Sequence, residues 1–501
     1  MIIFTYREET IMKKTLLFLL AALILTSCSS AGTSDTTASD TTAAPETESP
    51  YGSDGLPKAL DFGGETMGVC VGNYNDAYFS DLYSAEETGN RFSDAIYYML
   101  KGVEDRLNIK LEYQNDYYSY DDGAQQRMRI TSAIMAGDDW MDLIISANTY
   151  TTAVQEGEYF MDLNDLPYVN MEQPWYNQTV VQNMPTDYIY FALGSFSIAN
   201  VKNTYGLFFN QTLLQTMEID TDLYAMVDEG TWTIDALSTL VKDTYLDLDG
   251  NMKKTVGDQY GMTFGDYNKY LGLVPAFDIH VFEKTDEGYV FTYNSERAAS
   301  ALTRMCEWIN KTNDVAPAKF SLAADAADWF ISSGGGNGVN RVFMEGRALF
   351  SASLLADAET IVSEIDFEYG LLPYPKWDEN QSDYQTTLQR AAYALIPTTA
   401  DAEKSSALLE ALTAASYREL IPEYCEVSLK TRYSQDNDTS RMYDLIINSI
   451  VYDPGEIFGS QLGAPTGLFR DSIFNNQSNW ASKMEANEQK FISKMSEIVG
   501  Q

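Results

Sequence analysis

The 501-residue chain is poor in histidine, in cysteine and in positive charge, and each shortage excludes a class of function. His280 is the only histidine and lies in an apolar stretch, which favours a structural imidazole over a catalytic one. The four cysteines lie far apart and form no C-x-x-C pair, so neither a disulfide framework nor a zinc site is indicated. Lysine and arginine number 33 against 73 acidic residues, a net charge of −40 that excludes nucleic acid as a partner.

Phosphate binding has no sequence support either. The glycine-rich segment 332–338, SSGGGNG, lacks the Gly-Lys-Ser/Thr ending of a P-loop. Acidic side chains are so numerous that a pair suited to glycoside hydrolysis could be formed, so a secreted glycosidase stays open as an alternative. Three of the cysteines, Cys70, Cys306 and Cys425, are expected to be buried thiols.

The N-terminal region reads as an export signal. Residues 13–28, KKTLLFLLAALILTSC, join two lysines to an apolar run too short to span a bilayer, and Met12 is the expected start. The segment ends in a lipobox-like LTSC, which predicts cleavage before Cys28 and acylation of that cysteine, including palmitate. The Ser-, Thr- and Ala-rich segment 28–57 cannot bury enough apolar surface to fold and is expected to be a flexible tether.

The remaining stretch of roughly 440 residues is too long for one hydrophobic core, so two lobes are expected. Strands and helices alternate along its first part, which predicts an α/β domain with a mostly parallel sheet. The predicted strands of that part are 66–72, 109–113 and 141–146, and the predicted helices are 92–107 and 125–136. A second unit begins with a strand at 205–210, and Thr233 is the expected N-cap of a helix at 234–242.

Several segments, in their order and spacing, resemble the extracellular solute-binding lipoproteins of carbohydrate ABC importers, the group that includes maltose-binding proteins. They are AGDDWMDLI at 136–144, YGLFFN at 205–210, GTWT at 230–233, FMEGRALF at 343–350, YGLLPYPK at 369–376 and ALIP at 394–397. The resemblance implies a two-lobe periplasmic-binding-protein-like fold (type II) whose lobes close over a solute by hinge bending. It further implies carbohydrate capture without enzymatic activity, delivery to ABC permease subunits and a monomer held at the extracellular face of the cell membrane by its lipid.

The domain organisation that we expect follows from this pattern. It comprises a signal peptide at 1–27, a tether at 28–57, a first lobe at 58–205, a second lobe at 206–342, a return to the first lobe at 343–392 and mainly second-lobe helices at 393–501. A surface adhesin or peptide-binding receptor would share the anchor and tether without requiring several crossings between lobes.

Sugars present apolar C–H faces and rings of hydroxyl groups, so their sites combine aromatic rings with polar side chains. In an α/β sheet such side chains are expected beyond the carboxyl ends of the strands. The candidates that follow predicted strands are Tyr74, Asn75, Asp76, Asn148, Tyr150, Tyr267, Asn268, Ser351 and Ser353, with Trp329 and Trp377 as further aromatic candidates.

One segment has the oxygen-ligand spacing of a calcium loop. Asp247, Asp249, Asn251 and Asp258 imitate the EF-hand pattern, but Met252 stands where that loop needs glycine and the last ligand is Asp instead of Glu. A polar turn explains the same residues, so the sequence predicts no obligatory cofactor and leaves a structural Ca²⁺ open.

Overall fold

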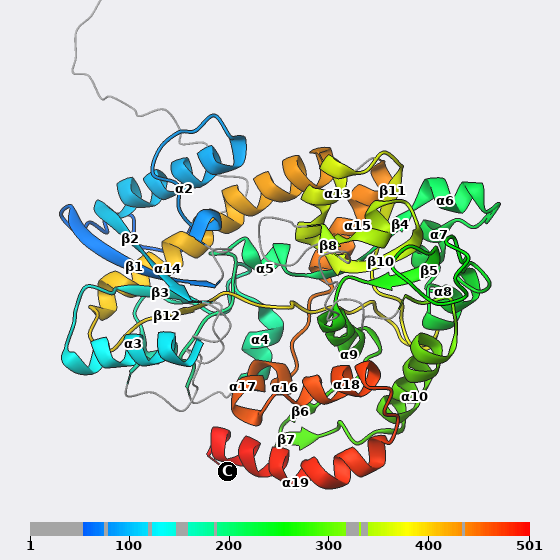
Figure 1. The fold of residues 1–501 in the computed structure, drawn as a ribbon. Coiled ribbons are helices and arrows are strands. Elements are labelled where there is room, and N and C mark those ends of the chain that lie inside the picture. The colour runs from blue at the N-terminus through cyan, green and yellow to red at the C-terminus, as the bar shows by residue number, and fades with distance from the viewer. Residues whose placement is uncertain are drawn as a thin grey trace, which may run out of the picture. The chain divides into compact units, whose positions relative to one another are not determined.

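The computed structural model describes residues 54–74, 79–118, 123–146, 159–184, 188–316, 330–331, 339–432 and 436–500. All of them belong to one compact unit, residues 51–501. Its larger elements form two four-stranded sheets flanked by helices (Figure 1). The strands of the first sheet are β1 (Glu65–Tyr74), β2 (Ile109–Tyr118), β3 (Leu143–Ser146) and β12 (Tyr393–Leu395), and those of the second are β4 (Tyr205–Asn210), β5 (Tyr260–Phe264), β10 (Ala348–Leu354) and β11 (Tyr369–Leu372).

The helices cover both sheets and the connections between them. Those that contact the first sheet are α2 (Arg91–Leu107), α3 (Gly123–Ala136) and α14 (Ala402–Ala415), while α4 (Gln178–Asn183) and α5 (Ala199–Lys202) lie in the chain between β3 and β4. The others are α6 (Gln211–Thr216), α7 (Leu223–Asp228), α8 (Ile234–Leu240), α9 (Leu273–Ala276), α10 (Glu296–Lys311), α12 (Arg341–Met344), α13 (Ala358–Glu364), α15 (Asn437–Asn448), α16 (Pro454–Ile457), α17 (Gly459–Leu462), α18 (Pro465–Phe474) and α19 (Trp480–Val499). Two further antiparallel pairs of strands are β6 (Phe282–Thr285) with β7 (Gly288–Phe291) and β8 (Phe330–Ile331) with β9 (Val339–Asn340).

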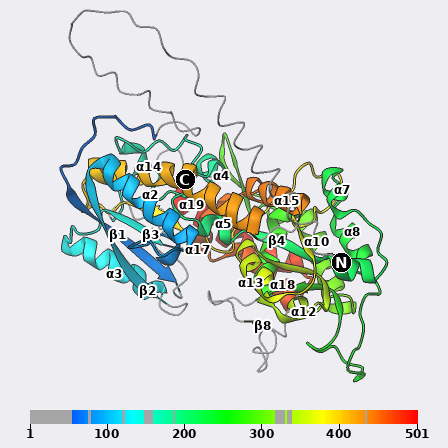
Figure 2. The ribbon, with the colours of Figure 1, turned by 90° about the horizontal axis from the view of Figure 1, so that it is seen from above.

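The first sheet has the order β12-β3-β1-β2, with β1 parallel to both β2 and β3. Its three predicted strands are therefore confirmed, although β2 runs five residues further than expected. Helices α2 and α14 lie on one face of this sheet and α3 lies on the other, as Figures 1 and 2 show from two directions. The side chain of Asn90 caps α2 by accepting from the backbone N–H of Phe92 and Ser93, and α2 ends where Asn108 adopts a positive φ.

The second sheet has the order β11-β4-β10-β5 and is buried on both faces. Strand β10 runs parallel to β5 and antiparallel to β4. The predicted strand at 205–210 is confirmed as β4. Thr233 caps α8 as expected, since its hydroxyl accepts from the backbone N–H of Ala236.

The predicted return to the first lobe at 343–392 is wrong. Strands β10 and β11 from this segment pair with β4 and β5, so they complete the second sheet. The chain rejoins the first sheet one step later, because β12 pairs with β3 and α14 packs against α2. Residues 393–415 therefore belong with the first sheet, and the second-lobe helices resume at α15, which packs against β11.

Three connections join the two sheets. Thr204, before β4, forms an antiparallel bridge with Leu388, and the backbone N–H of Gln389 donates to the carbonyl of Asn203 at 2.9 Å. These two connections thus run side by side. The third is the segment Ser416–Leu420 and Glu423–Arg432, which leads from α14 toward α15. The several crossings expected from sequence are confirmed.

The tether ends earlier than residue 57. Asp54 and Leu56 are both buried, and the Arg106 guanidinium donates to the Asp54 carboxylate at 2.8 Å. The same guanidinium reaches the carbonyl of Leu56 at 3.3 Å. Residues 54–57 are therefore part of the folded body, because an ion pair and core contacts outweigh their loop-like composition.

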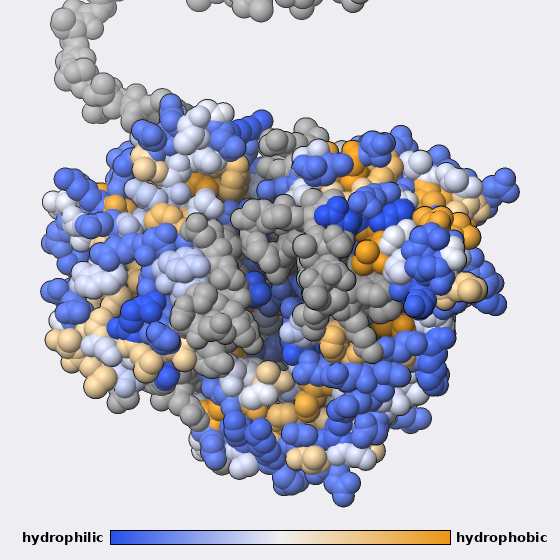
Figure 3. Space-filling model, viewed as in Figure 1, coloured by the Kyte–Doolittle hydropathy of each residue, from blue (hydrophilic) through white to orange (hydrophobic). Residues whose placement is uncertain are grey.

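The burial of the cysteines and the polarity of the surface agree with what the composition predicts. Cys70, Cys306 and Cys425 are unpaired and buried, and loss of hydration raises the pKa of Cys70 to about 12. One face of the molecule is largely hydrophilic, with apolar side chains gathered in small separate patches (Figure 3). None of the described helices is both long enough and apolar enough to cross a bilayer.

Candidate ligand-binding site

The carboxyl ends of β1 and β3 meet at one edge of the first sheet. The two strands run parallel with Gly72 opposite Ser146, the last residue of β3, so both strands end at the same edge of the sheet, as the sequence predicted. Tyr74 is the last residue of β1. Asn73 before it is buried, and its side-chain oxygen accepts from the backbone N–H of Phe79 at 3.2 Å. The other candidates of this edge, Asn75, Asp76, Asn148 and Tyr150, lie outside the described residues, as does Trp329.

The carboxyl ends of β5 and β10 meet in the same way in the second sheet. Phe264 lies opposite Ala352, and the backbone N–H of Gly265 continues the pairing by donating to the Ala352 carbonyl at 2.9 Å. The chain then turns into the 3₁₀ helix η4 (Tyr267–Gly272), whose N-cap Asp266 accepts from the backbone N–H of Asn268 at 2.6 Å. Tyr267 and Asn268 therefore stand at the strand end where the sequence predicted them.

Arg470 completes this edge, and sequence reasoning missed it. It lies on α18 and donates from Nη1 to the side-chain oxygen of Asn268 at 3.0 Å. Its guanidinium carbon lies 4.7 Å from the centroid of the Tyr267 ring, within the range of a cation–π contact. One face of that ring is thus covered by a cation. Tyr267, Asn268 and Arg470 together offer a partly exposed ring edge, an amide and a guanidinium, the mixture that hydroxyl-rich solutes require.

A buried lysine ties this edge to the connection between the sheets. Lys269 is 2% exposed, and its ammonium group lies 3.4 Å from the Asp266 carboxylate and 2.8 Å from the side-chain oxygen of Gln389. Gln389 belongs to one of the two paired connections. Burial raises the pKa of nearby Asp357, and the positive charge of Lys269 opposes that rise. The loop after β5 is therefore fixed to the connection that carries Gln389.

The predicted position of Ser351 and Ser353 is wrong. Both lie inside β10 instead of following it, and their exposed fractions are 0% and 1%. Every residue of β10 is buried because the sheet is covered on both faces, so neither hydroxyl can reach a solute from this position.

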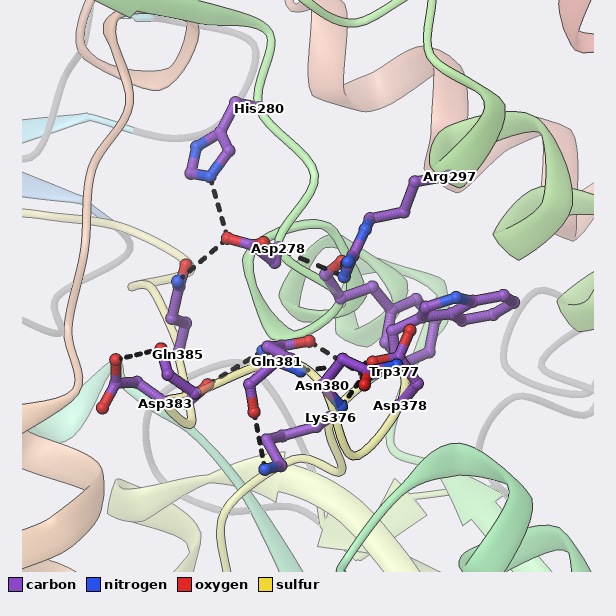
Figure 4. A network of polar contacts seen from close by, with 12 residues as sticks. Asp278, His280, Arg297, Lys376, Trp377, Asp378, Asn380, Gln381, Asp383 and Gln385 are labelled. Carbon is purple, nitrogen blue, oxygen red and sulfur yellow. Dashed lines mark hydrogen bonds and ion pairs between the residues drawn. The ribbon is translucent and has the colours of Figure 1, made fainter. Parts of the chain in front are cut away.

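Trp377 and His280 lie in a separate polar network (Figure 4). The Trp377 ring meets Phe277 at a centroid distance of 5.4 Å, and its backbone N–H donates to the side-chain oxygen of Gln381. His280 Nε2 lies 3.1 Å from the carboxylate of Asp278, which also accepts from the Gln385 side chain at 3.1 Å. The imidazole is thus one member of a hydrogen-bonded chain.

The calcium-like segment folds into a compact acidic turn. Carboxylate oxygens of Asp247, Asp249 and Asp258 lie within 4.8 Å of one another, so among the described residues these are the ones that could hold a cation. Each also accepts backbone N–H groups of the turn: Met252 donates to Asp247 at 2.7 Å and Thr255 donates to Asp258 at 2.8 Å. Asn251 points its amide nitrogen at Asp249, 2.6 Å away, and so contributes no oxygen to the group.

No protein-family model matches the sequence, and no curated protein matches it. Solved structures share its fold. The GacH receptor of Streptomyces glaucescens, solved unliganded and with acarbose, is 13% identical, with a TM-score of 0.53 over 87% of this chain and 99% of that chain. An extracellular solute-binding protein from Staphylococcus aureus in complex with maltose is 13% identical, with a TM-score of 0.56 over 86% and 98% of the two chains. Maltose-bound MalE3 of T. maritima is 12% identical, with a TM-score of 0.51 over 87% and 99%. The chain therefore has the two-lobe type II binding-protein fold.

Proposed function

We propose that this protein is the solute-binding component of an ABC importer and captures a carbohydrate, an oligosaccharide, between its two lobes. The observation that carries the proposal is the shared two-lobe fold. It extends over 86–87% of this chain in structures that hold maltose or acarbose. The polar edge formed by Tyr267, Asn268 and Arg470 supports it, because it lies at strand ends, where ligands bind in α/β folds. Asn75, Asp76, Asn148, Tyr150 and the Tyr74 position are proposed to face it from the first lobe.

The proposed role is capture and delivery without chemistry. Binding energy from contacts on both lobes favours the closed form, since those contacts exist together only when the lobes approach. The closed, loaded protein then docks on the permease subunits of the importer. Lys269 fits this role because it joins the loop after β5 to a segment that connects the lobes.

Titration with saccharides tests the proposal. Maltose, maltotriose and acarbose are added to the folded body, residues 54–501, and binding is measured by calorimetry and by thermal unfolding. A sugar present at 100 times its dissociation constant is expected to stabilise the protein by about 2.7 kcal/mol. Mass spectrometry of the recovered saccharide is expected to show it unchanged. Absence of binding across a wider panel of glycans contradicts the carbohydrate proposal, and cleavage products favour the glycosidase alternative instead.

The anchor is proposed from sequence, since residues 1–53 lie outside the described residues. Signal cleavage before Cys28 and acylation of its thiol place the protein at the outer face of the cell membrane. Cys28→Ala is expected to release the protein into the washed supernatant with its thermal unfolding midpoint unchanged. Retention of the variant in the membrane fraction contradicts the proposed lipid attachment.

A further inference from the structure

A cavity of about 320 Å³ lies between α4, α9, β6 and α16. None of the residues that form the Tyr267, Asn268 and Arg470 edge lines it. Its volume is about twice that of a cavity known to hold benzene, so it accommodates a small organic molecule.

The walls of this cavity are fixed by hydrogen bonds from several elements. The Asn183 amide at the end of α4 donates to the carbonyl of Tyr452 at 2.7 Å. The Lys284 ammonium on β6 donates to the carbonyls of Gln182 and Met184 at 2.9 and 2.7 Å. The cavity is therefore a built feature of the fold and not a gap beside a loose loop.

Two carboxylates in the wall, those of Asp453 and Glu456, form no ion pair within the described chain. Asp453 accepts only backbone N–H groups, from Val281 at 3.0 Å and from the first turn of α16, and Glu456 accepts from the hydroxyl of Thr387 at 3.1 Å. No lysine, arginine or histidine of the described chain forms an ion pair with either one. Burial raises the pKa of both carboxyls above the usual range. The charge of Asp453 raises the pKa of Glu456 further, whereas backbone N–H donors and the nearby His280 oppose the rise at Asp453.

The two basic groups of the wall are already engaged elsewhere. Lys284 is committed to its two carbonyl partners, and His280 Nε2 lies against Asp278, as Figure 4 shows. A third carboxylate, that of Glu283, lies at the exposed rim. The cavity therefore has an excess of negative charge and of hydrogen-bond acceptors.

The remaining wall is apolar. Val274, Pro275, Ile279 and Phe282 line it and are buried members of the surrounding core. An occupant thus meets an acidic side and a hydrocarbon side. A molecule with a protonated amine at one end and a short aliphatic body matches both, since the amine supplies the missing charge and the body covers apolar surface.

We propose that this cavity is a second ligand-binding site, specific for a small organic cation whose ammonium group pairs with Asp453 and Glu456 while its aliphatic part packs against Ile279 and Phe282. Such a molecule is distinct in chemistry from a neutral saccharide, and its site shares no residue with the edge proposed to bind one.

The test compares butylammonium chloride with 1-butanol, which has the same length and no charge. Binding to the folded body is measured by calorimetry at pH 7.5, with sodium chloride added to equal ionic strength. Butylammonium is expected to bind at least tenfold more tightly than 1-butanol. Glu456→Gln keeps the shape of the side chain and is expected to weaken butylammonium binding at least tenfold, whereas Glu307→Gln, on the exposed face of α10, leaves it unchanged.

A second variant tests whether binding needs the cavity volume, independently of the charge of its wall. Val451→Phe fills part of the cavity without altering any carboxylate and is expected to weaken butylammonium binding as well. Circular dichroism and the unfolding midpoint establish that each variant is folded. Equal affinity for butylammonium and 1-butanol overturns the proposal, as does full butylammonium affinity in folded Glu456→Gln or in folded Val451→Phe.

Discussion

The loop after β5 holds buried carboxylates and the cavity beside α16 holds half-buried ones, but only the loop pairs its carboxylates with a buried cation. At the loop, the Lys269 ammonium lies 3.4 Å from Asp266 and its charge also acts on Asp357. At the cavity, Asp453 and Glu456 are bound by neutral donors alone. Inside the first lobe, Glu410 on α14 resembles the cavity, because its partner is the hydroxyl of Tyr176 at 2.7 Å.

This difference assigns different roles to the two regions. A buried carboxylate with a fixed cation is neutralised in place, so it holds its surroundings together and has little capacity to bind a further charge. A buried carboxylate without one keeps an elevated pKa and is stabilised by gaining a proton or an external cation. The first region is therefore suited to positioning the edge that carries Asn268, and the second to taking up a charged molecule.

The largest expected effect comes from removing the cation of the first region. Lys269→Met leaves Asp266 and Asp357 buried without their positive partner, and loss of one member of a buried pair costs about 3 to 5 kcal/mol of unfolding free energy. Urea denaturation at pH 7.5 measures it. Lys101→Met is the matched control, since Lys101 pairs with Glu104 on the surface of α2 and its loss is expected to cost less than about 0.5 kcal/mol. A cost below about 1 kcal/mol for Lys269→Met would mean that the ion pair does not stabilise the loop.

The Glu410 carboxyl, which has no cation as its partner among the described residues, is expected to make the stability of the protein depend on pH. Burial raises the pKa of Glu410 to about 7 from 4.5 in the unfolded chain. Folding therefore favours the protonated form, so the stabilisation is complete below about pH 4.5 and is lost as pH rises through 7. Glu410→Gln can still accept from Tyr176 and does not ionise. The variant is expected to equal the wild type near pH 4.5 and to exceed it by roughly 3 kcal/mol at pH 8. A difference that stays constant between these pH values would contradict the elevated pKa.

An intermediate effect is expected at the polar edge itself and depends on the proposed carbohydrate function. Arg470→Met removes the donor to Asn268 and the charge over Tyr267, and truncation of a central interface arginine is expected to weaken saccharide binding about tenfold. Calorimetry with the tightest saccharide of the panel measures it. Arg304→Met, which removes a surface contact with Asp235, is expected to leave the affinity unchanged. Equal affinities in the two variants would place the solute away from this edge.

Local signals in the sequence were enough to predict individual helices and strands. The cap at Thr233 and the apolar runs of β1, β3 and β4 each specify a helix or strand from neighbouring residues alone. The assignment of 343–392 failed because the choice of sheet depends on pairing between segments far apart in the chain, β10 with β4 and β5. No local pattern encodes that partner.

Only those site residues that follow a predicted strand could be predicted from the sequence. Tyr267 and Asn268 follow β5 directly, so their position could be predicted, whereas Arg470 reaches them from a helix 202 residues away. Ser351 and Ser353 were misplaced because β10 is apolar or buried throughout and shows no alternation that would mark an outward face. The acidic cavity was missed for the same reason as Arg470, since its walls come together only in the fold.

The smallest expected effect concerns the acidic turn of Asp247, Asp249 and Asp258, a third cluster of carboxylates without a cation. Asp249 is exposed and Asp247 is partly exposed, whereas Asp258 is buried, so water already solvates part of the charge of the turn. Loops of this kind outside cells bind calcium with dissociation constants of about 10⁻⁴ to 10⁻³ M. We therefore expect 2 mM Ca²⁺ to stabilise the protein by about 1 kcal/mol, a rise of about 2 °C or less in the unfolding midpoint. Asp249→Asn should remove the rise, and equal Mg²⁺ should not reproduce it. If the wild type and Asp249→Asn respond alike to Ca²⁺, the carboxylates of the turn serve only to accept its backbone N–H groups. Cation binding would then be expected at the cavity and not at the turn.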